Sequence, residues 1–170
     1  SIAAAIILSP ATFAADMEDI ERLTVKGKYL SVNQSNSIKS PTPIIDVPQS
    51  LSIITAEEIT ARGITSIGQI IDYAPGVNTS QGEGHRDSVV FRGVSSTADF
   101  YWEGNRDDVQ YYRALYNVEQ VEILRGPNAL LFGRGGTGGI LNRVSKKAKT
   151  GDKFVNYNVS ANTFGAYNLQ

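Results

Sequence analysis

The run Val118-Glu-Gln-Val-Glu-Ile-Leu-Arg-Gly-Pro127 is the most regular stretch of this chain of 170 residues. Its apolar and β-branched side chains predict a strand, which the Gly-Pro pair ends. One helical turn is expected at 129–132, and a glycine-rich segment, 133–139, comes next. Residues 140–144 are mostly β-forming and predict a second strand. Two strands joined by a short glycine-rich connection indicate a small sheet.

Short helices and strands are predicted upstream of this sheet. Thr55 and Glu58 have the spacing of a capping box, in which a hydroxyl and a carboxylate each accept a backbone N–H at the start of a helix. Ser66 is suited to cap a second helix. The predicted elements are strands at 50–54, 88–92 and 100–102 and helices at 56–62 and 67–73. The fold class is therefore α+β, a small mixed-sheet domain over residues 43–148.

The last residues, 149–170, have a different pattern. Apolar and polar side chains alternate for about nine residues from Phe154, which is the pattern of one transmembrane β-strand. An ordinary half-buried antiparallel strand gives the same alternation. Residues 165–169 are expected to begin a return strand.

The first residues resemble a targeting segment. An apolar run, 2–8, is broken by Pro10, and small residues follow at Thr12-Phe13-Ala14. This predicts a truncated secretory signal over 1–15, with a small buried helix or strand as the alternative. Residues 16–42 are polar, and 33–37 in particular are predicted to be a flexible linker.

Composition excludes several classes of function. The chain has no cysteine and a single histidine, His85, so thiolate or His-rich metal sites are not available within it. A formal net charge of −1 gives no electrostatic reason to bind nucleic acid. No spacing of Ser, His and Asp is typical of an enzyme, so we expect no catalytic and no metal-binding residues.

The segment Gly133-Arg-Gly-Gly-Thr-Gly138 formally fits the dinucleotide-binding motif. That motif requires a helix after it and an acidic residue about 20 positions later. Here β-forming residues follow, and Asp152 comes too early. We therefore interpret the glycines as sterically required, where the backbone passes close to a wall or to another strand.

Five segments together resemble the plug domain of TonB-dependent siderophore receptors, and they occur in the order of that family. They are Val47-Pro-Gln-Ser-Leu-Ser-Ile-Ile54, Ile70-Ile-Asp-Tyr-Ala-Pro-Gly-Val77, Phe91-Arg-Gly93, the run 118–127 and Leu131-Phe-Gly-Arg-Gly-Gly-Thr-Gly-Gly-Ile-Leu-Asn142. The resemblance implies a plug inside an outer-membrane β-barrel of about 22 strands, with its first strand and turn in 149–170. The implied partners are the C-terminal domain of TonB, the protein's own barrel, outer-membrane lipid and a ferric siderophore.

The implied function is active import of an iron chelate, so iron would be cargo and no cofactor is expected. Haem, a vitamin or a glycan are alternative cargoes. A secreted or periplasmic binding module that reuses the fold is a further alternative, as is the nucleotide enzyme considered above.

The resemblance also implies a TonB box, the short peptide that couples such receptors to TonB, near the mature N-terminus. The candidate is Glu21, Arg22, Leu23, Thr24 and Val25, although Arg22 departs from the commonest form. An extended peptide on a flexible leash can add a strand to a partner's sheet edge.

In the family, two plug arginines pair with glutamates of the barrel wall. By resemblance these are Arg92 and Arg125, and Glu119 and Glu122 are expected to join the same charge network. Such residues would be structural or gating rather than substrate ligands.

Substrate contacts are expected from loops at the outer end of the plug. Aromatic and arginine side chains suit anionic, aryl-bearing ferric chelates, and the run 106–117 resembles catecholate-type receptors. The candidates are His85, Arg86, Tyr101, Trp102, Tyr111, Tyr112 and Arg113. The alternative for the aromatic members is packing between plug and barrel.

Overall fold

The structure is a computed structural model that describes residues 35–38, 43–80, 84–96, 99–133, 136–148, 150–151, 153 and 155–169. The chain divides into two compact units, residues 1–30 and 31–170. The first unit, with the predicted signal and TonB box, lies outside the described residues. The description below therefore concerns the second unit.

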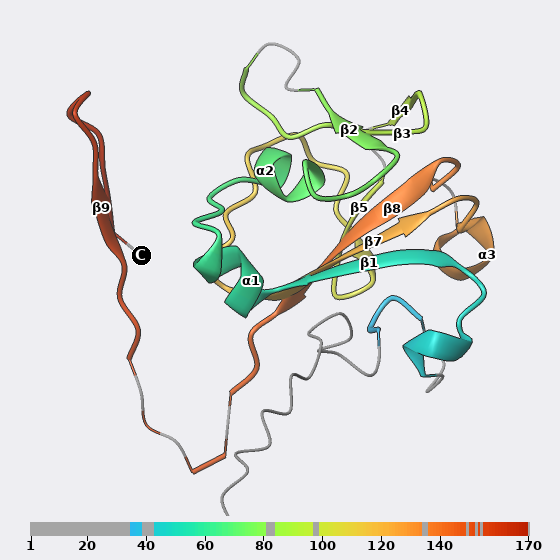
Figure 1. Cartoon of the computed structure of the whole chain (residues 1–170), viewed down its shortest axis with the longest axis horizontal. Coiled ribbons are helices and arrows are strands. Elements are labelled where there is room, and N and C mark those ends of the chain that lie inside the picture. Colours follow the sequence, from blue (N-terminus) through green and yellow to red (C-terminus); the bar gives the residue numbers. More distant parts are fainter. Residues whose placement is uncertain are drawn as a thin grey trace, which may run out of the picture. The chain divides into compact units, whose positions relative to one another are not determined.

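The second unit combines strands with short helices (Figure 1), as the α+β prediction requires. A five-stranded sheet has the order β1-β7-β8-β5-β6, in which β5 and β8 are parallel and the other neighbours antiparallel. Strands β2, β3 and β4 form a second sheet, and β9 pairs with β10. The elements are η2 (Ile44–Asp46), β1 (Ser50–Thr55), α1 (Ala56–Ala61), α2 (Ile67–Ile71), β2 (Val77–Thr79), β3 (Val89–Phe91), β4 (Val94–Ser96), β5 (Phe100–Trp102), β6 (Asn105–Arg106), β7 (Val118–Arg125), α3 (Ala129–Phe132), β8 (Gly139–Ser145), β9 (Val159–Ala161) and β10 (Tyr167–Leu169).

Both predicted helix starts are confirmed. Thr55 Oγ1 accepts the N–H of Glu58 at 3.4 Å, and the Glu58 carboxylate accepts the N–H of Thr55 at 3.3 Å, which completes the capping box. Ser66 caps α2 through its hydroxyl. Helix α2 ends two residues earlier than predicted, because Tyr73 N–H bonds back three residues to Ile70 O at 3.2 Å and tightens the last turn.

The two faces of the five-stranded sheet are covered differently. Because side chains alternate along a strand, Val121 and Ile123 of β7 lie on one face, where they share a core with Ile59 of α1 and three isoleucines of α2. We call this the helix face. On the opposite face, Leu124 packs in a smaller cluster with Phe132 of α3. Residues 35–37, here named the strap, lie on that second face, which we call the strap face.

The glycine-rich segment brings the backbone close to other strands. A Cβ on Gly138 would lie 2.8 Å from Phe91 Cβ, and one on Gly139 would lie 2.5 Å from the Leu124 carbonyl oxygen. Strand β8, not a helix, follows these glycines. The steric interpretation is therefore confirmed, and the structural context of a dinucleotide loop is not present.

The C-terminal hairpin is only partly as predicted. A return strand, β10, does pair with β9, but β9 has three residues rather than about nine. The register pairs Tyr167 with Ala161 and Leu169 with Val159, and an isolated two-stranded hairpin is only marginally stable in water. The described side chains of 155–169 are exposed. Within the described part of the chain, no helix has both the length and the apolar character needed to cross a membrane.

Candidate functional site

Two of the predicted substrate-contact regions come together as a pair of loops. The first loop, residues 84–88, precedes β3, and the second loop, residues 107–113, follows β6. The Tyr112 hydroxyl donates to the Gly84 carbonyl at 2.9 Å, and a side-chain hydrogen bond joins Arg86 to Gln110. These bonds connect residues more than 20 positions apart, which local sequence patterns do not report.

The predicted contact residues divide by exposure. His85 and Tyr112 are exposed, Tyr111 is 37% exposed, and Arg86 and Trp102 are partly buried. Tyr101 is buried on the strap face, where its hydroxyl donates to Phe132 O at 3.3 Å. Strand alternation explains the difference, because Tyr101 and Trp102 are consecutive residues of β5 and point to opposite faces. For Tyr101 the structure shows internal packing within this unit.

Arg113 lies beneath the second loop rather than on its surface. Its guanidinium, almost fully buried, stacks 3.7 Å from the centre of the Phe100 ring. It donates to three carbonyl oxygens of its own loop, those of Asp107 (3.0 Å), Val109 (2.7 Å) and Tyr111 (3.2 Å). Arg113 therefore determines the curvature of the loop from inside.

A second buried arginine, Arg143 of β8, was not predicted from sequence. Both its NH2 group and Arg113 Nε donate to the same Asp107 oxygen. The Arg143 guanidinium lies 4.5 Å from the centre of the Trp102 ring. The sequence did contain a signal for this residue. Arg143 is a charged residue within a largely apolar strand, and a charge that is buried in this way requires a partner.

Burial perturbs the ionisation of two groups below the loops. The pKa of Asp87 is raised above its usual value by desolvation, although a hydrogen bond from Arg113 N–H and the charges of Arg113 and Arg143 oppose the shift. The pKa of Arg113 is lowered by burial, which outweighs the attraction of Asp107. Asp87 Oδ2 accepts Arg113 N–H at 2.7 Å, so the two loops also share a buried backbone contact.

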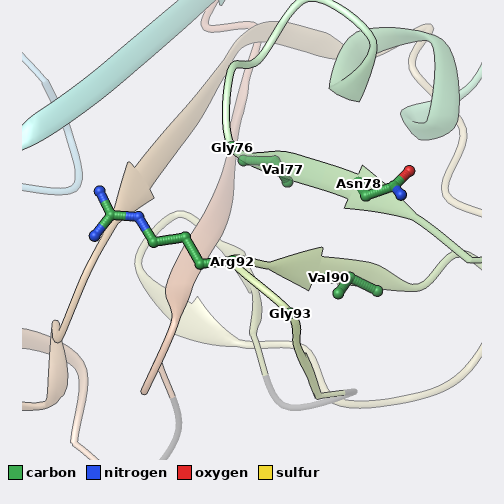
Figure 2. Close-up of a pocket in the computed structure, with 6 residues that line it drawn as sticks. All are labelled: Gly76, Val77, Asn78, Val90, Arg92 and Gly93. Carbon is green, nitrogen blue, oxygen red and sulfur yellow. The ribbon is translucent and has the colours of Figure 1, made fainter.

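Arg92 and Arg125 lie at another edge of the unit. Arg92 borders an open pocket of about 390 Å³ that is lined by residues in and next to the paired strands β2 and β3, and Figure 2 shows its side chain pointing away from Asn78 and Val90. Arg125 donates to the hydroxyls of Ser50 (2.8 Å) and Ser52. Burial and the nearby charge of Arg92 lower the pKa of Arg125. Two like charges thus adjoin, and the hydrogen bonds of Arg125 named here are with neutral hydroxyls.

Glu119 and Glu122 have different environments, although both were assigned to one network. Glu119 is exposed, whereas Glu122 is fully buried on the strap face. Glu122 accepts the N–H groups of Asn36 and Ser37, each at 2.7 Å, and the Ser37 hydroxyl. The linker prediction is therefore wrong at residues 35–37: Ser35 and Ser37 are buried, because a carboxylate inside the sheet needs donors and this segment supplies them.

The described residues were compared with the requirements of a metal site. Among the described residues there is no group of three or more His, Cys, Asp or Glu side chains arranged to hold a metal ion. What the loops offer instead is a surface of rings and a guanidinium above a buried charge cluster, which suits binding rather than catalysis.

The sequence matches a family described as "TonB-dependent Receptor Plug Domain" over residues 43–140. The chain belongs to this plug-domain family of TonB-dependent receptors. The relatives that this chain matches are TonB-dependent receptors, and such receptors are outer-membrane proteins.

Named relatives agree with this assignment. The chain is 33% identical over 164 residues to "Probable TonB-dependent receptor BfrD" of Bordetella pertussis, covering 89% of this chain and 22% of that protein. It is 38% identical over 124 residues to the "Ferrioxamine B receptor" of Salmonella typhimurium, covering 67% of this chain and 18% of that protein. The chain thus spans about a fifth of the length of the relatives it matches.

Solved plug domains have the same fold. The siderophore receptor PiuA from Acinetobacter baumannii is similar at 34% identity with a TM-score of 0.67, over 74% of this chain and 18% of that one. The ferric-catecholate import receptor Fiu from E. coli K12, in its open form, is similar at 28% identity with a TM-score of 0.61, over 69% of this chain and 17% of that one.

Proposed function

We propose that this chain is the plug and N-terminal segment of a longer outer-membrane receptor that imports a ferric siderophore, and that the paired loops contact the chelate. The observation that carries this proposal is the joining of residues 84–88 to 107–113 by hydrogen bonds. The joined surface presents His85, Tyr111 and Tyr112 together with Arg86.

The chemistry of this surface favours an anionic chelate with aromatic groups. A ferric tris-catecholate carries negative charge on aryl rings, which tyrosine rings can stack against and a guanidinium can attract. The loops are already tied to each other and to the sheet, so little ordering is required on binding. Catecholate-type cargo is therefore the form of the proposal that the side chains support best.

Uptake by the full-length receptor tests the proposal. The receptor would be expressed in cells that lack their own siderophore receptors. These cells would be given radioactive iron in one of three forms: the ferric complex of 2,3-dihydroxybenzoate, ferrichrome or ferrioxamine B. We expect uptake of the catecholate complex, and a loss of about tenfold in apparent affinity for Tyr112→Ala. Uptake of ferrichrome or ferrioxamine B alone would contradict the catecholate form, and uptake of none of the three would contradict siderophore import.

Energy coupling is proposed to act through residues 21–25. A proline at Leu23 removes a backbone donor and distorts a strand added to the edge of a partner's sheet. Leu23→Pro should abolish uptake while leaving chelate binding unchanged, and Leu23→Ala serves as the matched control that keeps the donor. Wild-type uptake by the proline variant would contradict this position for the box.

Arg92 and Arg125 are proposed to face carboxylates of the barrel wall. The support is the neutral hydroxyl partners of Arg125, a partly buried cation, and the nearby charge of Arg92, which is exposed. A partly buried cation beside a like charge is stabilised most by an opposite charge. In the full-length receptor, the double substitution Arg92→Gln and Arg125→Gln should loosen the plug, detected as faster proteolysis of the plug in intact outer membranes.

A further inference from the structure

Arg143 is an unusual residue for the interior of a small sheet. Its side chain is the largest of those that are fully buried among the described residues, and it lies on the helix face of β8. In the parallel pairing of β5 with β8 it is the register partner of Trp102. Its Nε finds no hydrogen-bond acceptor among the described residues. Because a buried guanidinium is strongly destabilising unless it is paired, its remaining contacts must compensate.

The side-chain hydrogen bonds of Arg143 both lead to the second loop. Arg143 NH2 donates to Asp107 Oδ2 and, at 3.0 Å, to the Tyr111 hydroxyl. The Tyr111 hydroxyl in turn donates to Asp107 Oδ2 at 2.7 Å. The polar end of Tyr111 is therefore held from two sides, while the residue as a whole is 37% exposed.

The two arginines have separate tasks in the second loop. Arg113 binds the carbonyls of its own loop and so maintains the loop's internal shape. Arg143 comes from β8, more than 30 positions along the chain from Asp107, and so ties the loop to the sheet. Without Arg143 the loop would keep its curvature but lose this side-chain connection to β8.

We propose that Arg143 is a positioning residue for chelate recognition, which holds the Tyr111 ring in place through its hydroxyl and the Trp102 ring through its guanidinium face. The inference rests on the proposed function. It adds a residue that cannot touch the chelate itself, since Arg143 is buried.

Substitution of Arg143 in the full-length receptor tests the inference, with the ferric complex of 2,3-dihydroxybenzoate as the probe. Arg143→Met fills a similar volume without charge. It should weaken binding about tenfold, as loss of one well-placed contact residue does, and raise the apparent KM of uptake without changing its maximal rate. Arg143→Lys keeps the charge and should recover part of the affinity.

A double-mutant cycle with Tyr111→Phe separates positioning from general destabilisation. If Arg143 acts through the tyrosine hydroxyl, the two losses should not add. The affinity of the double variant for the ferric complex should then be no lower than that of the single variant with the lower affinity. Two controls are matched. Arg62→Met removes an exposed arginine on α1 that pairs with Glu58, and Ile71→Val makes a small core defect; both should bind as wild type. Wild-type affinity in Arg143→Met, or strictly additive losses in the cycle, would overturn the inference.

Hydrogen exchange of the same variants decides the inference even if no ferric complex binds. Arg143→Met should speed amide exchange in residues 107–113 more than in β7, and Arg143→Lys should do so less. Unchanged protection of that loop would show that Arg143 does not position it. Failure of the wild-type receptor to bind the probe, with faster loop exchange in Arg143→Met, would contradict the proposed cargo and leave the positioning role standing.

Discussion

The two faces of the five-stranded sheet each contain a buried charge, and they stabilise it in opposite ways. On the helix face, the Arg143 cation meets another charge, the carboxylate of Asp107, which it shares with Arg113. On the strap face, the Glu122 anion accepts hydrogen bonds from neutral groups, the strap and the side chains of Gln120 (2.6 Å) and Asn142 (3.2 Å).

The difference shows which neighbouring segment each charge holds. On the helix face, Arg143 and Arg113 share the carboxylate of Asp107, and this holds the loop that we assign to the chelate. On the strap face, the Glu122 carboxylate accepts N–H groups of the strap and so holds that segment, which follows the predicted TonB box in the sequence. Asn142 connects Glu122 to the turn before β6, since its amide donates to Glu122 at 3.2 Å while its oxygen accepts Gly104 N–H at 2.9 Å. The following experiments test whether the two arrangements behave as differently as their partners imply.

The largest effect is expected from Glu122→Ala. The substitution leaves several buried donors of the strap, Gln120 and Asn142 without an acceptor, so local stability should fall by about 3 kcal/mol. Native-state hydrogen exchange of the full-length receptor should show the loss at the strap and in β7 but not in residues 107–113. Glu119→Ala, on the same strand but exposed, is the control and should change little. An equal loss of local stability at the strap and in residues 107–113 would mean that the two faces do not hold their neighbouring segments independently.

A smaller effect is expected from Asp107→Asn. Asparagine keeps an acceptor oxygen but no charge, so Arg113 and Arg143 would lose their shared counter-charge. The second loop should lose about 2 kcal/mol of local stability, read from the exchange of its amides, while the strap stays protected. The partial exposure of Asp107 places this value below that for Glu122. An unaffected loop would mean that hydrogen bonding alone, as on the strap face, is sufficient.

Gln120→Leu sharpens the account of the strap face by removing one donor to Glu122 and no charge. The carboxylate keeps its other donors, so strap protection should fall by only about 1 kcal/mol. The same exchange measurement tests this, with Glu119→Ala again as the exposed control on the same strand. A loss as large as that of Glu122→Ala would mean that Gln120 is as important as the carboxylate.

The smallest effect is a pH dependence on the helix face. Because burial raises the pKa of Asp87 above its unfolded value of 3.8, the folded state binds the proton more tightly. Its contribution to stability is fully present below the unfolded pKa and is lost as pH rises through the folded one. Protection of residues 107–113, corrected for intrinsic exchange, should therefore decrease from pH 3.8 upward until the raised pKa has been passed. Asp87→Asn, which still accepts Arg113 N–H, should abolish that decrease; the same decrease in the variant would assign it to another group.

Local patterns predicted the elements well where the determinants are close in sequence. The capping box at Thr55 and the strand 118–125 depend on neighbouring residues. The glycine requirement at Gly138 and Gly139 was also predicted, although Phe91, which a Cβ there would meet, is distant in the sequence. Predictions failed where a distant partner decides. The strap contradicted the linker prediction because its partner, Glu122, lies 85 positions away from Ser37.

The sequence by itself indicated the family, the order of the longer strands and the helices, and which residues are candidates for binding, because these follow from short motifs and periodicity. It did not indicate the short strands β2, β4 and β6. Only the tertiary structure decided that Tyr101 and Arg113 are internal, that Arg143 reaches the second loop, and that Glu122 holds the strap. The physical reason is that buried charges must find partners wherever the fold brings them. Those partners depend on which strands become neighbours, and residue spacing along the chain does not encode this.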